Sequence, residues 1–509
     1  MAKAKSSVGY IYNLVSLVGL ILAVVATGVI IAVLALEAIT GMENPYIGIL
    51  TYFILPSMLI FGLLLVPLGM FRVRMQRQAA GDEEIPPYPR IDLNDTHKRR
   101  LFVFFITSSV VFVLIIMVAT IKGYEFTEST TFCGELCHVP MEPEHTAWSN
   151  SPHAHVRCVE CHVGPGAAWY VKAKISGMRQ LYAVTAHTYP TPIETPIENL
   201  RPAKDTCQHC HWPEKFYSGR QKIYYHYAPN EQNTDREINM ILKIGVTPKA
   251  PADKGIHGHI DKDIHYIARD QKRQDLPYVV LKEKDGKIVE YLDTEKPLTK
   301  DEIAKGNKRE MDCIDCHNRP SHVYRSPSRE MDESFASGRI DVTLPYIKKV
   351  AVDLLTKTYK SEEEADASIA KGIPDYYAAS YPKLVTPKAA SIKQAVEEVK
   401  KIYARNFFPK MKVSWYTYPD NIGHLYFPGC FRCHDGKHKS ADGKVISKDC
   451  NLCHTVIGQK QENVPAGSAV TKFTHPVDIG NELLKSNCTE CHGVIPKEEP
   501  GKEGHGKEH

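Results

Sequence analysis

Seven copies of one short cysteine–histidine pattern organise this chain of 509 residues. Six copies read Cys-x-x-Cys-His, one is longer by a residue, and together they use all fourteen cysteines. Two cysteines at this spacing can each form a thioether with one haem vinyl group, and the adjacent histidine can then bind the iron. The pattern therefore predicts seven covalently attached c-type haems.

The predicted attachment residues are Cys133, Cys137, Cys158, Cys161, Cys207, Cys210, Cys313, Cys316, Cys430, Cys433, Cys450, Cys453, Cys488 and Cys491. The predicted proximal iron ligands are His138, His162, His211, His317, His434, His454 and His492. In the first motif, CGELCH, the third residue between the cysteines must bulge outward for both sulfurs to reach one haem.

Zinc sites and disulfides are the other common uses of paired cysteines. Structural zinc usually joins two Cys-x-x-Cys halves, so an odd number of pairs would leave one half unmatched. Disulfides would not explain why a histidine follows every pair. We therefore favour haem for all seven motifs.

Three apolar runs in the first quarter of the chain, 11–36, 46–71 and 101–121, contain no Asp, Glu, Lys or Arg. Each reaches the length of about 20 residues that a helix needs to cross a bilayer. The first is too long for the core of a signal peptide and is followed directly by another span, so we expect an uncleaved anchor.

Basic residues beside the spans predict their orientation, because Lys and Arg are retained on the cytoplasmic side. They gather before the first span and in the 72–100 connection: Lys3, Lys5, Arg72, Arg74, Arg77, Arg90, Lys98, Arg99 and Arg100. The turn between the first two spans has none. The sequence thus predicts a bacterial inner-membrane protein whose haem motifs lie in the periplasm.

The expected fold is a three-helix membrane anchor followed by haem-dense, mostly α-helical or irregular cytochrome c domains. We predict an anchor at 1–122, a four-haem domain at 123–325 with a charged insertion at 213–310, a helical spacer at 326–415, a three-haem domain at 416–495 and a disordered tail at 496–509. Within the insertion, 278–292 predicts a β-hairpin turning at Asp285-Gly286. In the spacer, Ser361 with Glu364 and Ser391 with Gln394 predict two helix starts.

Low-spin electron-transfer haems need a second strong axial ligand. The last three motifs are accompanied by three further histidines, so we predict bis-histidine ligation there with His424, His438 and His475. In the first half, nine histidines compete for at most four places, and spacing does not choose among them: His153, His155, His187, His209, His226, His257, His259, His265 and His322.

From Phe102 to His322 the chain resembles the membrane-anchored quinol dehydrogenases of the NapC/NirT/NrfH family. The matching segments are FCGELCHVPMEP, WSNSPH before CVECHVGPG, VKAKISGMRQ, CQHCH and CIDCHNRPSH. The layout of three spans and seven haems is similar to that of the larger inner-membrane cytochromes of metal-reducing bacteria.

This resemblance implies that Met141 ligates a high-spin first haem near the membrane. It also implies distal ligation by His153 and His322, with His257 as a third candidate. Lys172 and Lys174 are candidates for the lysine that contacts the quinol. Several features depart from the family pattern. The first motif is CxxxCH, Met141 follows its histidine by three residues instead of two, and no acidic residue occurs between His162 and Glu194, so the proton acceptor stays open. Two extra N-terminal spans, the 213–310 insertion and the three-haem extension also exceed the four-haem pattern.

The leading hypothesis is oxidation of menaquinol at the outer leaflet, with electrons passed along the haems to a periplasmic c-type cytochrome. The expected partners are the quinone pool and the bilayer, without nucleic acid, and the oligomeric state stays open. One alternative is a terminal reductase of nitrite, hydroxylamine or a metal at a haem with an open distal position. The other is an electron-storage cytochrome without a quinol site.

Overall fold

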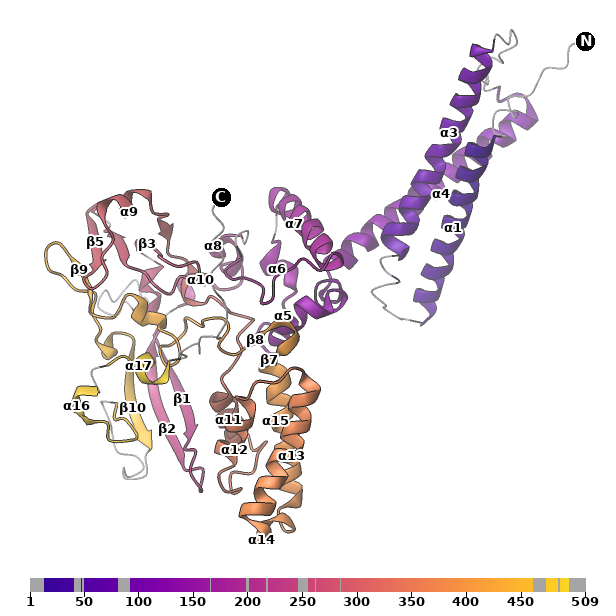
Figure 1. Ribbon diagram of the computed structural model, residues 1–509. Helices are drawn as coiled ribbons and strands as arrows, with labels where there is room; N and C mark the ends of the chain where they lie inside the picture. Colours follow the sequence, from indigo (N-terminus) through magenta and orange to yellow (C-terminus); the bar gives the residue numbers. More distant parts are fainter. Residues whose placement is uncertain are drawn as a thin grey trace, which may run out of the picture. The chain divides into compact units, whose positions relative to one another are not determined.

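Two compact units make up the chain, residues 1–138 with 157–159 (unit 1) and residues 139–156 with 160–509 (unit 2). The computed structural model (Figure 1) describes residues 13–40, 47, 50–80, 92–164, 166–197, 201–216, 218–245, 255–260, 262–283, 285–460, 473–483 and 486–493. Lys3, Lys5, Arg90 and the predicted disordered tail lie outside these described residues.

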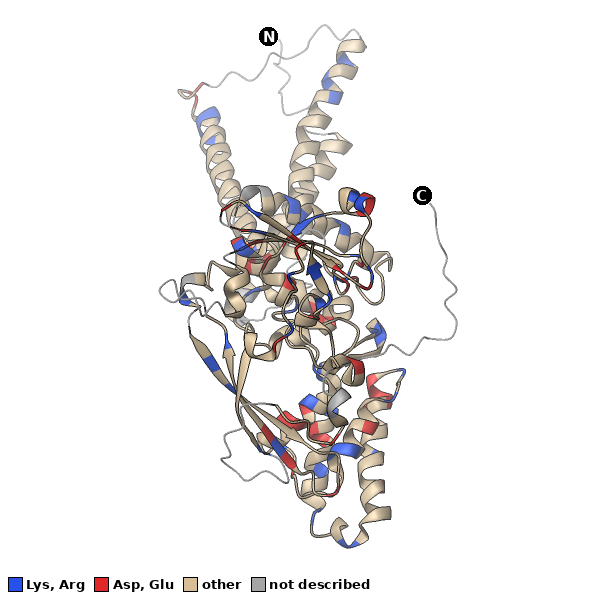
Figure 2. Cartoon of the chain, turned by 90° about the vertical axis from the view of Figure 1, so that its left-hand side faces the viewer, with Lys and Arg blue, Asp and Glu red and all other residues tan. Residues whose placement is uncertain are grey.

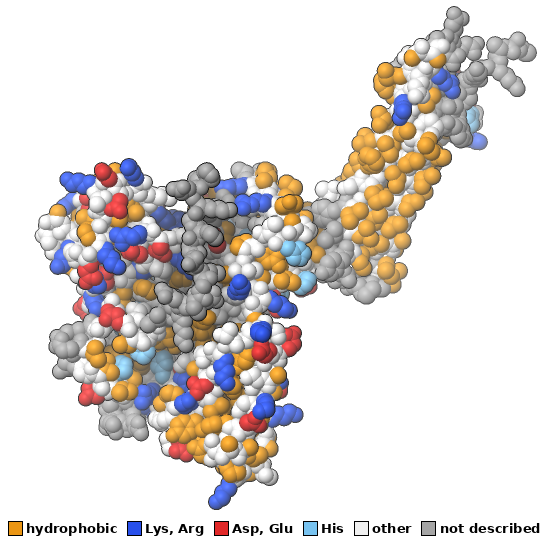
Figure 3. All heavy atoms as spheres, viewed as in Figure 1, with side chains coloured by type: hydrophobic (Ala, Val, Ile, Leu, Met, Phe, Trp, Pro, Cys, Tyr) orange, Lys and Arg blue, Asp and Glu red, His pale blue; other side chains and the backbone are white. Residues whose placement is uncertain are grey.

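Three helices of unit 1 are long and apolar enough to cross a membrane, which confirms the three predicted spans. They are α1 (Leu14–Thr40), α3 (Leu55–Ala79) with the π-helical turn η2 (Leu50–Ile54) directly before it, and α4 (Thr96–Thr127). Figure 2 shows these helices almost free of charged residues along their length, with basic residues gathered near helix ends. Their surface is dominated by hydrophobic side chains in Figure 3, as expected of helices that face lipid.

Helices α1 and α3 pack closely because glycines face each other across the contact. A Cβ atom at Gly19 would lie 2.5 Å from the carbonyl oxygen of Gly62, and one at Gly62 would lie 2.7 Å from that of Gly19. Small residues allow such close approach of backbones, which is how helices associate in lipid. The Ser16 hydroxyl adds a hydrogen bond of 2.9 Å to the Val66 carbonyl.

Helix α4 leads directly into the first motif. It runs six residues beyond the predicted span and ends at Thr127, and the π-helix η3 (Thr131–Leu136) follows after three residues. Cys133 is therefore held within a few residues of the third span, and both belong to unit 1.

Unit 2 contains three antiparallel sheets among its described residues, more regular β-structure than the sequence predicts. The first sheet has the order β1 (Gly219–Tyr227), β2 (Asp235–Lys243), β10 (His454–Lys460). The second has the order β6 (Arg309–Glu310), β3 (Asp263–Ile267), β4 (Tyr278–Lys282), β5 (Ile288–Asp293), β9 (His438–Ser440), and the third pairs β7 (Phe407–Phe408) with β8 (Val413–Ser414). The predicted hairpin is confirmed as β4 and β5, and Gly286 takes the positive φ of +86° at its turn.

The C-terminal motifs lie in the same compact unit as the insertion, and the predicted domain bounds stay predictions. Strand β10, which begins at the motif residue His454, extends the sheet formed by β1 and β2, and β9 pairs with β5. Strands β1, β2 and β5 all belong to the charged insertion 213–310. The insertion therefore joins the two groups of haem motifs through backbone hydrogen bonds, a pairing of distant segments that local patterns do not predict.

The segment between the two groups of motifs is helical and holds the largest buried core. Its helices are α11 (Pro327–Ala336), α12 (Ile347–Leu355), α13 (Glu362–Ser380), α14 (Pro382–Val385) and α15 (Ala389–Asn406). The predicted start at Ser361 is confirmed, since its side chain accepts a hydrogen bond from the Glu364 backbone. The predicted start at Ser391 is wrong. Helix α15 begins at Ala389, and the Ser391 hydroxyl instead donates to Asp341 at 2.8 Å.

The remaining helices and helical turns lie between these elements along the chain. They are α5 (His138–Ser149), α6 (Cys158–His162), α7 (Ala167–Thr185), α8 (Ala203–Cys207), η4 (Pro213–Lys215), η5 (Ile256–His259), α9 (Lys300–Lys305), α10 (Cys313–Cys316), η6 (Pro409–Met411), η7 (Gly429–Arg432), η8 (Cys450–Leu452), α16 (Gly480–Leu483) and α17 (Cys488–His492).

Candidate haem-binding sites

Each regular motif lies on or beside one short helical turn. In the third, fourth and fifth motifs, the backbone N–H of the motif histidine donates to the carbonyl of the first cysteine, at 2.8, 2.8 and 3.0 Å. This turn brings both sulfurs and the imidazole to one side of the backbone, as attachment to a single porphyrin requires. The cysteines of the last five motifs form no disulfide. The described residues contain no cluster of three or more His, Cys, Asp or Glu suited to a metal ion.

The stretched first motif has a different backbone. Its first cysteine lies in the π-helix η3, which ends at Leu136 directly before Cys137. A π-helix has about 4.4 residues per turn, more than the 3.6 of an α-helix, so residues four apart come closer to the same face. The wider turn accommodates the extra residue that the sequence predicts must bulge.

Six motif histidines each face one further imidazole. The ring centroids are 6.0 Å apart in the pair His153–His211, 6.2 Å in His162–His322, 6.3 Å in His257–His317, 5.8 Å in His259–His434, 6.2 Å in His424–His454 and 6.1 Å in His475–His492. Two imidazoles that bind one metal from opposite sides, each with a bond of about 2.0 Å, hold their centroids roughly 6 Å apart. The six pairs therefore fit six bis-histidine haems.

Hydrogen bonds fix the orientation of several of these imidazoles. The Nδ1 atom of His257 lies 2.9 Å from the Ile244 carbonyl oxygen, that of His259 lies 2.7 Å from the Ile256 carbonyl oxygen, and that of His434 lies 2.8 Å from the Ser447 carbonyl oxygen. A carbonyl oxygen only accepts, so Nδ1 carries the proton and Nε2 presents its lone pair. This is the second contact that metal-bound histidines usually make.

His438, predicted as a distal ligand, makes hydrogen bonds to the protein with both ring nitrogens. It is buried at the start of β9, where Nδ1 lies 2.9 Å from the Asp435 carboxylate and Nε2 lies 2.7 Å from the Leu276 carbonyl oxygen. Because both ring nitrogens are used by the protein, neither is available to iron. His434, the motif histidine nearest to it in sequence, instead faces His259.

His259 is one of the candidate histidines that sequence reasoning left unassigned. No local signal distinguishes it from its neighbours, because it comes from the insertion, 175 positions before His434. The structure also brings together the family-implied candidates in crossed pairs. His153, which precedes the second motif, faces the histidine of the third, and His322, which follows the fourth, faces that of the second.

A buried ion pair supports His322. Glu144 accepts two hydrogen bonds of 2.9 Å from Arg319, and its carboxylate lies 3.0 Å from Nδ1 of His322. Arg319 also donates from Nε to the His322 carbonyl and lies over the rings of Tyr324 and Tyr418. Burial alone would raise the pKa of Glu144, but the charge of Arg319 and the contact with His322 lower it to about 2. Glu144 is therefore an anion that orients the imidazole.

Two comparisons with known proteins bear on these sites. Residues 95–222 match the N-terminal region of the NapC/NirT cytochrome c family. Over 503 residues, or 99% of each chain, the sequence is 65% identical to the cytochrome c-type protein ImcH of Geobacter sulfurreducens. The chain belongs to the ImcH family of c-type cytochromes. No solved structure matches it significantly.

An ImcH-family cytochrome with three membrane-crossing helices is a membrane-anchored electron-transport protein that carries covalently bound haem. Its NapC/NirT region includes the third span, the first three motifs and the candidate quinol residues. The resemblance stated from the sequence motifs is thereby confirmed at the level of the family.

The first motif differs from the other six in this ImcH-family cytochrome. His138 has no paired imidazole among the described residues, whereas Met141 lies one turn further along α5. His145, one more turn along, stacks on Trp148 with ring centroids 5.4 Å apart. Met141 thus stays the proposed ligand of the first haem.

Lys172 and Lys174 lie on α7 next to aromatic rings. The Lys172 ammonium lies 4.9 Å from the centroid of Trp169, and that of Lys174 lies 5.1 Å from the centroid of Tyr170. The same helix exposes an apolar stripe at helical spacing, formed by Val171, Ile175, Met178 and Tyr182, whose exposed fractions are 54%, 59%, 65% and 69%. No acidic residue occurs in α7. Basic residues, ring systems and an exposed apolar stripe are the features of a helix that lies in a membrane interface.

Proposed function

We propose that this cytochrome oxidises menaquinol at the periplasmic face of the bacterial inner membrane and passes the electrons to a periplasmic c-type carrier. The observation that carries the proposal is α7. Its apolar stripe and its two lysines suit the depth at which a quinol head group lies, and α7 follows the second motif directly along the chain. Orientation by the positive-inside rule puts the motifs in the periplasm.

Seven c-type haems would supply one-electron acceptors suited to a two-electron donor. The chain's own residues then have three tasks. Lys172 or Lys174 donates a hydrogen bond from its ammonium to the quinol oxygen, which favours loss of the quinol proton because the resulting anion is stabilised. Met141 and His138 would hold the haem of the first motif, the motif closest to the third span along the chain. The six imidazole pairs would hold the other six haems.

The terminal-reductase alternative requires a haem with an open axial position. Among the described residues, imidazole pairs serve six motifs, so such a position would arise at the first motif, which is close to the third span along the chain, and would require displacement of the proposed Met141 ligand. A small-molecule oxidant would therefore compete with quinol at the same place. Storage of electrons without a quinol site would not require the two lysines and the exposed apolar stripe of α7.

The direct test uses the full-length protein in lipid nanodiscs. We expect a menaquinol analogue to reduce the haems to nearly the extent that dithionite does, and oxidised periplasmic c-type cytochrome to reoxidise them. Nitrite and hydroxylamine should reoxidise the protein far more slowly. Reduction by dithionite without reduction by the quinol analogue would contradict quinol oxidation, and fast nitrite turnover would favour the reductase.

The number of haems has its own test. Intact-mass spectrometry of the purified protein is expected to give the polypeptide mass plus seven covalent haems, because all fourteen cysteines form pairs at attachment spacing. The Cys137→Ser variant should lose an attachment at the first motif only. A wild-type mass with six haems and two alkylatable thiols at Cys133 and Cys137 would exclude the first motif.

A further inference from the structure

The turn η5 carries two imidazoles that belong to different pairs. His257 and His259 are two residues apart on this single turn, with buried Gly258 between them. His257 faces His317 of the fourth motif, and His259 faces His434 of the fifth. The ring of Phe216 stacks on His257 at 4.5 Å, which adds to the Nδ1 hydrogen bond in fixing that imidazole.

The fourth and fifth motifs are also bound to each other. Arg432, inside the fifth motif, donates from Nη2 to the carbonyl oxygen of Asp315, inside the fourth, at 2.6 Å. Its Nη1 donates to the Arg273 carbonyl at 2.9 Å. The Asn421 side-chain amide donates to the same Asp315 oxygen at 3.0 Å.

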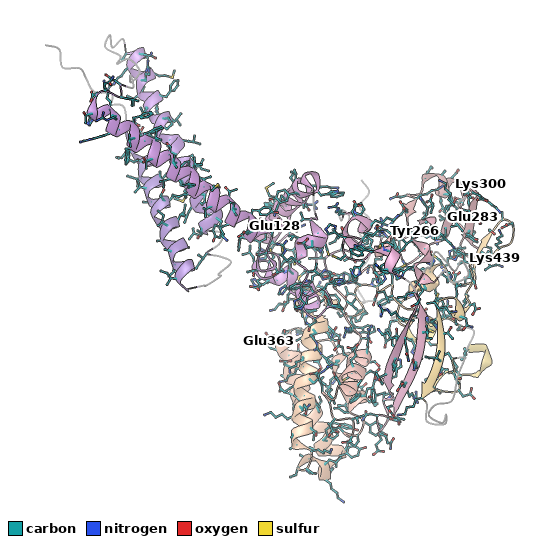
Figure 4. All side chains as sticks on the ribbon, turned by 180° about the vertical axis from the view of Figure 1, so that it is seen from behind. Glu128, Tyr266, Glu283, Lys300, Glu363 and Lys439 are labelled. Atoms are coloured by element: carbon teal, nitrogen blue, oxygen red, sulfur yellow. The ribbon has the colours of Figure 1, made fainter. Side chains whose placement is uncertain are left out.

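Asp315 is itself anchored from β3. Its buried carboxylate accepts a hydrogen bond of 2.6 Å from the Tyr266 hydroxyl and contacts Arg273 at 3.2 Å and Arg309 at 3.0 Å. Tyr266, labelled in Figure 4, lies on β3, the strand that follows η5 along the chain. The two motifs and β3, the strand after η5, are thus joined by hydrogen bonds and ion pairs at Asp315.

The other pairs stay within one half of the motif series. His153–His211 and His162–His322 involve only the first four motifs, and His424–His454 and His475–His492 involve only the last three. Among the described residues, η5 is the element whose imidazoles face motifs of both halves. It lies in the insertion, outside residues 95–222 that match the NapC/NirT region.

We propose that the His257-Gly258-His259 turn supplies the distal ligands of two haems, the fourth and the fifth, and so forms the crossing point between the membrane-side group of haems and the C-terminal group. The proposal rests on haem attachment at both motifs, as the proposed function requires. Two ligands on one short turn keep the two irons at a fixed separation, and electrons from the quinol reach the last three haems across this turn.

The experiment measures the spin state of the oxidised, full-length protein by electron paramagnetic resonance, without quinol. His257→Ala and His259→Ala should each convert one haem per molecule from low to high spin, and the double variant should convert two, because each imidazole serves a different iron. His265→Ala and His438→Ala are the matched controls. His265 lies on neighbouring β3 and contacts Asp263, and His438 makes only protein hydrogen bonds, so neither should change the spectrum.

Methionine variants separate ligation from folding. His259→Met should keep a low-spin haem but raise the reduction potential of that haem alone, as exchange of histidine for methionine does. A high-spin haem in His438→Ala, an unchanged spectrum in His257→Ala or His259→Ala, or one converted haem in the double variant would overturn the proposal. Since no step uses quinol, such a result would leave quinol oxidation untouched, and loss of quinol-driven reduction in the wild type would leave the ligand assignment untouched.

Discussion

Replacement of Arg319 by alanine is expected to lower the free energy of unfolding by about 3 kcal/mol, because the variant leaves the Glu144 carboxylate, which is only 20% exposed, without its cation. Arg319 is only 8% exposed and makes two hydrogen bonds to Glu144, one to the His322 carbonyl and two ring contacts. Urea titration of the detergent-solubilised protein, followed by circular dichroism, measures the change. Arg319→Lys should lose less, although a single ammonium cannot replace both Nη2, which donates to Glu144, and Nε, which donates to the His322 carbonyl.

A matched control for Arg319 is provided by an ion pair on the protein surface. Lys371 contacts Asp375 at 2.7 Å, but its side chain is 80% exposed, so Lys371→Ala should change stability by less than about 1 kcal/mol. In Arg319→Ala the imidazole of His322 also loses its support, and we expect the second haem to become partly high spin. An Arg319→Ala protein as stable as the control, with an unchanged spectrum, would contradict both expectations.

Simultaneous replacement of Lys172 and Lys174 by alanine is expected to slow menaquinol-driven reduction by about 10- to 100-fold, while dithionite reduction stays at the wild-type rate. A hydrogen bond from a charged group to a developing anion is worth about 1.5–3 kcal/mol, which corresponds to that range. Stopped-flow absorbance in nanodiscs measures both rates. Met141→Ala should slow the quinol reaction as well and change the spectrum of the first haem only.

The lysine prediction has a close control on β1. The Lys222 ammonium lies 5.2 Å from the centroid of Tyr224, the same kind of contact that Lys172 makes with Trp169, and Lys222→Ala should leave the quinol rate unchanged. Nanodiscs of zwitterionic lipid distinguish contact of the lysines with the quinol from binding of the lysines to anionic lipid head groups. If the lysines only bind anionic head groups, the defect will vanish in zwitterionic lipid, whereas a defect that persists supports contact with the quinol. Wild-type rates in the double variant and in Met141→Ala would place the quinol site elsewhere.

The sequence by itself determined the features that depend on local spacing. The spacing of the cysteines and the histidine after each pair predict the attachment sites, and the apolar runs identify the three spans, because thioether reach and bilayer thickness set fixed lengths along the chain. The hairpin at 278–292 and the helix start at Ser361 depend on nearest neighbours, and the structure has both.

Only the tertiary structure decided which imidazoles meet. A count of three histidines beside three motifs favoured His438, but the Leu276 carbonyl comes from a distant segment and occupies its Nε2. His259 meets His434 because β9 and β10 pair with strands of the insertion, which carries η5 to the fifth motif. Axial ligation joins two chain segments across an iron, so it depends on contacts between residues far apart in sequence, and spacing along one chain does not encode them.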